Sequence, residues 1–579
     1  MREQLRWIAT ICRANRRGIA LALAFTVIAA AVEVASIGMY YPILASLTGT
    51  PLGEGVAARF LAPLGRVLGA QPRMFQILIL LVGLLVVRAG CLYAARIISN
   101  HYELQLNLRL KRGFLRRLAA CTWEFTLKAE PGSLLNIFSQ YTTSTSRALF
   151  YLVEFLIDAV SCLAYLLFAV YVSPFFALFV LAAGLVAGPV LRRIYWRIKL
   201  LVEENIRLQN ALANQFLDYF QGLKTFKSMS LEEPYLLALD RDVKRFTDNE
   251  RRSYRVQAAL NVLGEPLFSV IGALFLLVAH YGFAVGMETV VIFFALLSKS
   301  YTRLNSLQSN AGRLIRNAGA IRTVESFERQ AIAAAERTTG RSLPGPIASV
   351  ELDGVRFTYP DGTMVFDGAS LRLDVARGLI AIAGSSGGGK STLLDLLSGL
   401  LTPTMGAIRI NGVDTRDLDM RALRARVGFV PQRPVLFRRS IMENISLRER
   451  AETDTAAVEQ AARLADAHEF VSRLARGYDT LMGEEGASLS VGQIQRLSIA
   501  RALYQQPEIL FFDEPTSALD PAATAEVMRV IEKIAMTYPV FLITHSPDVQ
   551  RYAPTLLLVE GRGVRVVEVT GIAGGGDRR

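Results

Sequence analysis

The sequence predicts a helical membrane domain followed by an α/β domain, and three observations carry this prediction. The chain has 579 residues, which is too many for a single hydrophobic core. It is 52% hydrophobic, and the apolar residues are concentrated in its N-terminal portion. After residue 350, short β-rich runs alternate with helical patterns. A membrane portion followed by a soluble portion explains this asymmetry.

Six apolar runs are long enough to cross a bilayer, which takes about 20 residues of helix. They lie at 18–46, 75–99, 148–172, 175–196, 259–283 and 287–309. Because the first run is long and others follow it, we interpret it as a retained membrane helix and not as a signal peptide. The segments 100–147 and 197–258 are charged and helically periodic, so we expect them to project well beyond the membrane on its cytoplasmic side.

The net charge of +13 fits a membrane protein better than a nucleic-acid-binding one. Basic residues precede the first run and close the fourth, which is the distribution that the positive-inside rule predicts for cytoplasmic loops. No basic stripe is interleaved with exposed aromatic residues, so we expect no nucleic-acid partner. The four cysteines lack metal-ligand spacing and are expected to be packing residues.

The composition changes abruptly at "ERTTGRSLPGPIASV", which we interpret as a linker between the two domains. We therefore expect a membrane domain at 1–325, a linker at 326–348, an α/β domain at 349–567 and a disordered tail at 568–579. The runs "GLIAIAG", "VGFVPQ", "EILFFDEP" and "VFLITHS" predict buried strands of a largely parallel sheet.

The strongest motif is "GSSGGGKST", which fits the pattern G-x-x-x-x-G-K-[ST] between an apolar strand and a helix. Its glycines allow backbone amides to surround a polyphosphate, Lys390 supplies a positive charge, and Ser391 can ligate Mg²⁺. The predicted loop consists of Gly384, Ser385, Ser386, Gly387, Gly388, Gly389, Lys390, Ser391 and Thr392.

A second motif, "EILFFDEPTSALD", completes a hydrolytic site. A buried strand that ends in Asp513 places a carboxylate where Mg²⁺ needs one. The adjacent Glu514 can orient or deprotonate an attacking water. Without the phosphate loop, an acidic pair after an apolar strand would indicate only an ordinary strand end.

Residues from about 350 to 565 resemble the nucleotide-binding domain of ATP-binding-cassette (ABC) transporters, and "LSVGQ" resembles the LSGGQ signature of that family. The resemblance implies ATP and Mg²⁺ as ligands, and it implies roles for further residues. Those residues are Tyr359 for adenine stacking, Gln432 as the Mg²⁺-touching Q-loop residue, Ser490, Gly492 and Gln493 of the signature, Asp520 of the D-loop, and His545 as the switch histidine near the γ phosphate.

Two positions depart from the family pattern. Val491 stands at the third signature position, where the family usually has glycine, so we expect retained function with altered affinity. Ser546 and Pro547 follow the switch histidine where many exporters have arginine.

The membrane part resembles that of an exporter half-transporter, fused ahead of one nucleotide-binding domain. This implies coupling helices at 127–140 and 215–226, a homodimer in the membrane lipid, and the signature of one subunit capping the ATP held by Lys390 of the other. The termini and the ATPase domain are then cytoplasmic, in a bacterial inner membrane.

Charged residues inside the predicted spans cost about 2.5 to 3.5 kcal/mol each at a helix centre, so they predict a polar cavity. An alternative is that they lie near the membrane interface and reach lipid headgroups. We expect Glu154 and Asp158, four residues apart on one helix face, to line the cavity or to pair with Arg88. The candidate cavity residues are Glu33, Arg88, Glu154, Asp158 and Glu265.

The resemblance implies an ATP-hydrolysing exporter or flippase of an amphipathic substrate. The stretch "AVEVASIGMYYPILASL" resembles the first span of flippases for lipid-linked oligosaccharides. A peptide natural-product exporter and a multidrug exporter remain alternatives, as do an ATP-gated channel and a heterodimer with another subunit.

Overall fold

The structure is a computed structural model, and it describes residues 16–40, 43, 74–172, 174–283, 287–337, 339–483, 489–545 and 553–568. It divides into two compact units. The membrane unit comprises Met1–Leu115 and Leu134–Glu328, and the ATPase unit comprises Arg116–Ser133 and Arg329–Arg579. The predicted tail lies outside the described residues beyond position 568.

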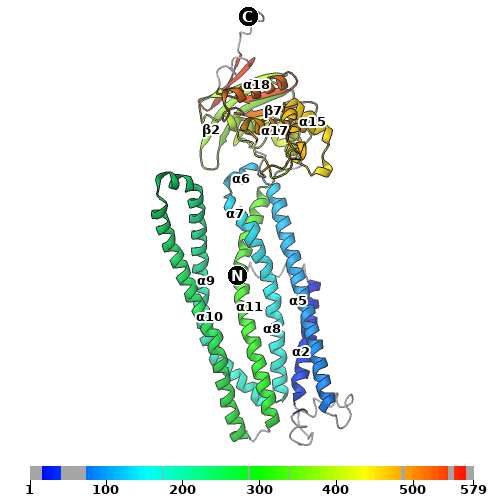
Figure 1. The fold of residues 1–579 in the computed structure, drawn as a ribbon, viewed down its shortest axis with the longest axis vertical. Coiled ribbons are helices and arrows are strands. Elements are labelled where there is room, and N and C mark those ends of the chain that lie inside the picture. Colours follow the sequence, from blue (N-terminus) through cyan, green and yellow to red (C-terminus); the bar gives the residue numbers. More distant parts are fainter. Residues whose placement is uncertain are drawn as a thin grey trace, which may run out of the picture. The chain divides into compact units, whose positions relative to one another are not determined.

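The membrane unit is built of long helices, as predicted (Figure 1). Within the described residues, three stretches are long and apolar enough to cross a membrane: Arg16–Gly38, Met74–Ala119 and Pro131–Tyr171. The predicted fourth, fifth and sixth spans lie in α9, α10 and α11, where many side chains are outside the described set. Among the described residues, its helices are α2 (Arg16–Gly38), α5 (Met74–Ala119), α7 (Pro131–Asn136), the π-helix η1 (Ile137–Tyr141), α8 (Thr142–Val172), α9 (Pro174–Met229), α10 (Glu232–Phe283) and α11 (Met287–Ala333).

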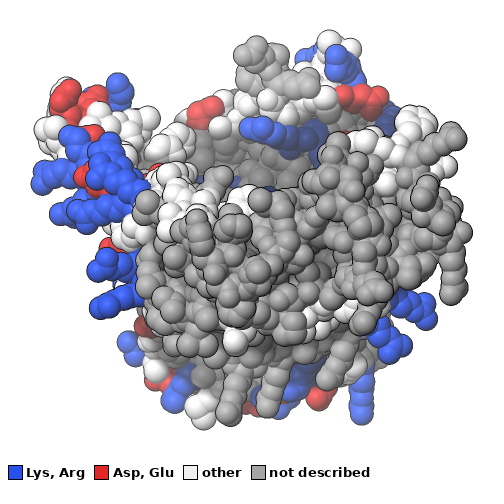
Figure 2. Space-filling model, turned by 90° about the horizontal axis from the view of Figure 1, so that it is seen from below, with Lys and Arg blue, Asp and Glu red and all other residues white. Residues whose placement is uncertain are grey.

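The segment 215–226 does not form the separate short coupling helix that we expected. It belongs to α9, which continues to Met229 and ends where Ser230 takes a φ of +53°. The rings of Tyr219, Phe226 and Tyr235 pack with centroids 4.8 to 5.4 Å apart, and this packing joins α9 to α10 into one hairpin. Lys and Arg side chains gather at the left of Figure 2, where this hairpin lies in Figure 1.

The segment 127–140 does contain short helices. In the ATPase unit, α6 (Trp123–Lys128) ends before Pro131, where α7 begins. Proline fixes its own φ and disfavours helix in the residue before it, which separates the two elements.

The ATPase unit contains two sheets, as the alternation of strand and helix patterns predicts. The larger has the strand order β10-β9-β3-β8-β7-β6, in which only β10 is antiparallel to its neighbour. The smaller, β2-β1-β4-β5, is antiparallel. The strands are β1 (Ser349–Thr358), β2 (Met364–Asp374), β3 (Gly378–Gly384), β4 (Met405–Ile410), β5 (Val413–Asp414), β6 (Val427–Val430), β7 (Ile509–Asp513), β8 (Pro539–Ile543), β9 (Thr555–Glu560) and β10 (Gly563–Glu568).

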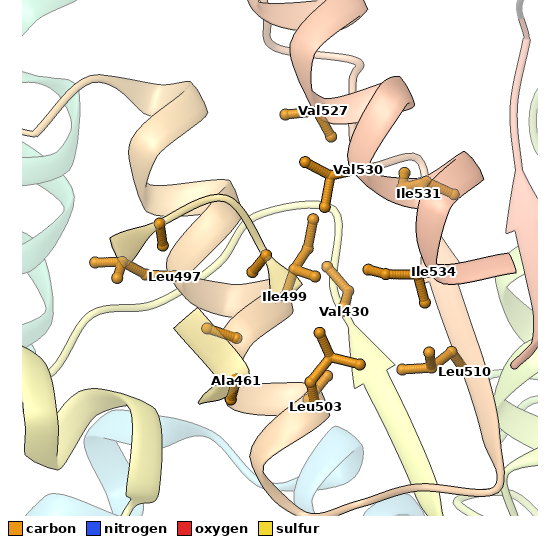
Figure 3. Packing of buried hydrophobic residues seen from close by; sticks show 14 of the residues in the cluster. Val430, Ala461, Leu497, Ile499, Leu503, Leu510, Val527, Val530, Ile531 and Ile534 are labelled. Carbon is orange, nitrogen blue, oxygen red and sulfur yellow. The ribbon is translucent and has the colours of Figure 1, made fainter. Parts of the chain in front are cut away.

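Helices cover the larger sheet because their apolar stripes match its apolar strands. Side chains of α17 and α18, such as Ile499 and Ile534, pack with Val430 of β6 and Leu510 of β7 in one buried cluster (Figure 3). The α-helices of this part are α12 (Lys390–Leu397), α13 (Met420–Arg424), α14 (Ile441–Ser446), α15 (Thr455–Leu464), α16 (His468–Ser472), α17 (Val491–Tyr504) and α18 (Pro521–Ala535).

The predicted linker is shorter than expected at its start, because α11 continues to Ala333. The described residues after it run along the ATPase unit, where Leu343 and Ile347 are buried. This segment is therefore packed against the domain that it precedes.

Candidate functional sites

The phosphate loop lies between β3 and α12, as predicted. Gly384 has a φ of +155°, and a Cβ there would lie 2.3 Å from the carbonyl oxygen of Val559. Gly389, at the N-cap of α12, has a φ of +102°, and its Cβ would lie 2.4 Å from Cγ1 of Val365. Both positions therefore require glycine, and the loop leads directly into the N-terminus of α12, where the first amides have no partner within the helix and can bind an anion.

Lys390 is held within this loop. Its side chain is buried, and Nζ donates to the carbonyl oxygens of Gly384 at 3.3 Å and Ser385 at 3.0 Å. These bonds hold a positive charge inside the loop. The loop thus offers a polyphosphate both backbone amide donors and a positively charged side chain.

Ser391 and Asp513 are brought together from positions 122 residues apart. The Ser391 hydroxyl donates to Oδ1 of Asp513 at 3.0 Å. Burial raises the pKa of Asp513, and neighbouring Glu514 raises it further, while the hydrogen bond from Ser391 lowers it. A divalent cation beside such a carboxylate would offset the cost of its charge, so the residues present fit Mg²⁺.

Glu514 is contacted by two of the predicted residues. Nε2 of Gln432 donates to Oε2 of Glu514 at 2.9 Å, and Nε2 of His545 lies 3.0 Å from Oε1. Glu514 has a φ of +43°, in the left-handed region that residues other than glycine rarely adopt. Such conformations cluster at functional sites, where the surrounding contacts maintain them.

Tyr359 is located at the edge of this site. Its hydroxyl lies 3.0 Å from Oγ1 of Thr392, and its ring packs edge-on against Phe357. This contact places the tyrosine beside the last residue of the phosphate loop, and its role in adenine stacking stays a prediction.

The signature motif forms the N-terminus of α17. The Ser490 side chain accepts from the Gln493 amide, and the Gln493 side chain accepts from the Ser490 amide, so the two form a capping box. Val491 is 51% exposed. A Cβ on Gly492 would lie 3.3 Å from Cβ of Ala523, so this position has little room for a side chain. Asp520 similarly caps α18 by accepting from the amide of Ala523.

Two further residues belong to this region, although the sequence did not single them out. Ser517 accepts from Gln432 at 3.4 Å between Nε2 and Oγ. Burial, together with the charge of Asp513, raises the pKa of Asp395 to about 6. Asp395 lies one turn after Ser391 on α12, so its i, i+4 spacing from a predicted metal ligand was a signal that could have identified it.

The membrane unit contains a network of buried charges. Glu33 of α2 is 3% exposed and lies 2.7 Å from Nη2 of Arg88 on α5. Asp158 of α8 is also 3% exposed and accepts from Nη1 of Arg303 at 3.2 Å and from Asn310 at 2.9 Å, both on α11. Arg303 also lies 3.8 Å from Glu33, so the two pairs form one network across four helices.

The expectation that Arg88 pairs with Glu154 or Asp158 was therefore wrong. Arg88 pairs with Glu33, and Asp158 pairs with Arg303 of α11, which is distant in the sequence. Within the described residues, Oε1 of Glu154 is buried and has no hydrogen-bond partner. The side chain of Glu265 lies outside the described set. Arg303 and Lys299 were missed, although both are basic residues within the predicted sixth span.

Together, the phosphate loop, the acidic strand end and the helical membrane unit define a membrane-embedded P-loop ATPase. The family described as "ABC transporter" matches residues 369–517, and that described as "ABC transporter transmembrane region" matches residues 19–302. The chain belongs to the ABC transporters and is an integral membrane protein with an ATP-hydrolysing domain of that type.

Individual relatives agree with this assignment. The ABC transporter ATP-binding protein y4gM of Sinorhizobium fredii is 29% identical over 416 residues, which cover 70% of each chain. The ABC multidrug transporter atrC of Emericella nidulans is 40% identical over 223 residues, which cover 37% of this chain and only 17% of that relative.

A solved structure of a bacterial Atm1-family ABC exporter with ATP bound is also similar. It matches with a TM-score of 0.75 at 22% identity, and the match covers 96% of each chain. At this identity the likeness shows a common fold, namely the exporter-type membrane domain followed by its ATPase domain.

Proposed function

We propose that the protein is a homodimeric exporter or flippase that uses ATP hydrolysis to move an amphipathic substrate across a bacterial inner membrane, with its termini and ATPase unit in the cytoplasm. The observation that carries the proposal is the convergence of Gln432 and His545 on Glu514, next to the Ser391–Asp513 hydrogen bond and the phosphate loop. This hydrolytic machinery favours a pump over an ATP-gated channel, which would not need to hydrolyse ATP at every cycle.

In the proposed mechanism, the phosphate loop and Lys390 bind the ATP phosphates, and Tyr359 stacks on the adenine. Mg²⁺, held by Ser391, Asp513 and Gln432, would neutralise phosphate charge. Glu514 accepts a proton from the attacking water, while His545 and Gln432 orient its carboxylate by the contacts described above. The carboxylate is 20% exposed, so water can reach it.

Dimerisation is supported by surfaces that one copy leaves uncovered. Val491 is 51% exposed at the tip of the signature helix, and Phe220 on the α9–α10 hairpin is 67% exposed. We propose that a second copy covers such residues, and that Ser490, Gly492 and Gln493 of one subunit complete the ATP site of the other, with Asp520 beside it.

The substrate site is proposed to adjoin the buried charge network of Glu33, Arg88, Asp158 and Arg303. Membrane-embedded charges of this kind usually face a polar pathway, and Lys299, 50% exposed and 4.0 Å from Glu33, leads from the network to the surface of the membrane unit. Relatives named as multidrug transporters support a drug-like amphiphile, whereas the first-span resemblance supports a lipid-linked glycan.

The proposal is tested in vesicles by ATP-dependent transport of three probes: a fluorescent phospholipid, an amphipathic peptide and a cationic dye. We expect at least one probe to move against its gradient and to stimulate ATP hydrolysis. The Glu514→Gln variant should still bind ATP but lose turnover by about a hundredfold or more, because it lacks the general base. Full ATPase activity of this variant would contradict the assigned role of Glu514.

A further inference from the structure

The segment between α11 and β1 is held within the ATPase unit by several contacts, among them the side chain of Asn411 and an ion pair between Arg426 and Glu508. Nε of Arg426 donates to Oε1 of Glu508 at 2.7 Å, and Nη2 donates to Oε2 at 2.6 Å. This is the bidentate geometry in which an arginine and a carboxylate interact most strongly. The two side chains are 21% and 34% exposed, so neither is fully solvated.

The remaining hydrogen-bonding capacity of this pair is directed at the linker backbone. Nη1 of Arg426 donates to the Leu343 carbonyl at 3.1 Å, and Nη2 donates to the Gly345 carbonyl. Oε2 of Glu508 accepts from the Ile347 amide at 2.8 Å. Three backbone groups of the linker are therefore attached to one ion pair, and Leu343 and Ile347 bury their side chains beside it.

Arg426 and Glu508 lie at the N-terminal ends of two neighbouring strands, and the hydrolytic residues lie at the C-terminal ends of the same strands. Arg426 directly precedes β6, and Glu508 directly precedes the neighbouring parallel strand β7. At their other ends, β6 leads to Gln432, and β7 ends in Asp513 and leads to Glu514. Because a hydrogen-bonded strand moves as a unit, a shift of the site residues is transmitted along β6 and β7 to the linker.

The beginning of the linker is tied to the segment that follows α5. The amide of Thr122 donates to the Ala334 carbonyl at 2.9 Å, and the amide of Glu336 donates to the Ala120 carbonyl at 2.8 Å. Glu336 also accepts from Arg424 at 2.6 Å, two residues before Arg426. The chain segments that continue α5 and α11 are thus joined to each other and to the start of β6.

We propose that Arg426 and Glu508 are positioning residues that couple the ATP site to the membrane helices α5 and α11 through the linker. The inference rests on the proposed function, since it presupposes a conformational cycle driven by ATP. A freely jointed linker would let β6 and β7 move without α11, whereas this anchored linker makes them move together.

The test uses the full-length protein in vesicles of phosphatidylethanolamine and phosphatidylglycerol. The four native cysteines are replaced, and Leu104, which is 58% exposed on α5, is changed to Cys and spin-labelled. Two quantities are measured for each variant: the rate of ATP hydrolysis, and the shift in label-to-label distance between the two copies on adding ATP and vanadate.

For Arg426→Gln we expect hydrolysis within about twofold of the parent, while the fraction of molecules that shift falls at least about fivefold, the lower end of typical coupling energies. Glu508→Gln should behave in the same way, and Glu336→Gln should give a smaller loss of the same kind. Arg409→Ala, which breaks an exposed ion pair between Arg409 of β4 and Asp353 of β1, should change neither quantity.

The inference is overturned if both glutamine variants at the pair retain the full shift, or if hydrolysis and shift fall in parallel, which would indicate a merely structural role. If Arg426→Gln does not fold, Glu508→Gln decides alone, since its amide oxygen can still accept from Ile347. Absence of an ATP-dependent shift in the parent protein would instead contradict the proposed function.

Discussion

The ATP site and the charge network of the membrane unit solve the same problem in different ways. Both hold charged side chains away from bulk water. In the ATP site, Lys390 is satisfied by carbonyls five and six residues away in its own loop. In the membrane unit, Asp158 is satisfied by Arg303, 145 residues further along the chain. A charge can thus be stabilised by a local backbone conformation or by long-range packing, and only the first leaves a motif in the sequence.

The largest effect is expected when the positive charge of Lys390 is removed from the ATP site. Lys390→Ala should lower ATP hydrolysis by about a hundred- to a thousandfold, the usual loss when one group that stabilises transition-state charge is removed. The folded state should persist, because the loop geometry depends on its glycines. Steady-state ATPase kinetics check the rate, and thermal unfolding checks the fold. A rate within tenfold of the parent would show that the loop amides alone suffice.

Arg303, which pairs with residues far away in the sequence, should affect the stability of the protein more than its ATP hydrolysis. Arg303→Ala leaves Asp158 and Glu33 buried without a full complement of cations, which should cost about 3 kcal/mol or more in the free energy of unfolding. Thermal unfolding of the detergent-purified protein measures this loss. The double variant Arg303→Met with Asp158→Asn should recover most of it, whereas a double variant as unstable as the single one would argue against an electrostatic cause.

Asp395 extends the comparison, because it is a carboxyl group of the ATPase unit whose burial is only partly offset by its surroundings. Its pKa is raised to about 6, so the stabilisation associated with its neutral form is full below the unfolded-state pKa and is lost as pH rises through about 6. Asp395→Asn should therefore raise stability at pH 8 by about 1 kcal/mol, less than full linkage predicts because the side chain is partly solvated.

The same variant should gain less at pH 5, and nothing below about pH 3, where the aspartate is protonated in both the folded and the unfolded state. Melting temperatures of the full-length protein across this pH range measure the trend. A gain that is equal at all pH values would mean that the substitution acts through packing.

The smallest effect concerns Val491, the exposed residue that departs from the signature pattern. If the signature closes over the ATP of the other copy, Val491→Gly should raise the apparent affinity for ATP by no more than about fivefold, equivalent to about 1 kcal/mol. Val491→Ala should fall between the two. The concentration of ATP at half-maximal hydrolysis measures the change, and unchanged kinetics in both variants would show that the side chain does not affect the clamp.

Much of the fold and of the ATP site could be predicted from the sequence, because the signals are local. Apolar runs of membrane length, the strand patterns around "GLIAIA" and "EILFFD", and the glycine spacing of the phosphate loop each depend on neighbouring residues. The capping box of Ser490 and Gln493 spans only three residues, so the start of α17 was also predictable.

Other features could not be predicted. The helical periodicity of 197–258 did not show where the chain turns back; the ring packing of Tyr219, Phe226 and Tyr235 joins α9 to α10 across that turn. The pairing of Arg88 was misassigned because Glu33 and Asp158 compete for several arginines, and helix packing selects among them.

By itself, the sequence determined that this protein joins a helical membrane domain to a P-loop ATPase domain, and it located the glycine-rich loop between strand and helix. These properties arise from hydrophobic burial and backbone geometry over a few residues. Only the tertiary structure decided which charges pair within the membrane unit and that Arg426 and Glu508 anchor the linker. Those contacts join residues that are far apart in the chain, so they form only once the strands and helices have packed.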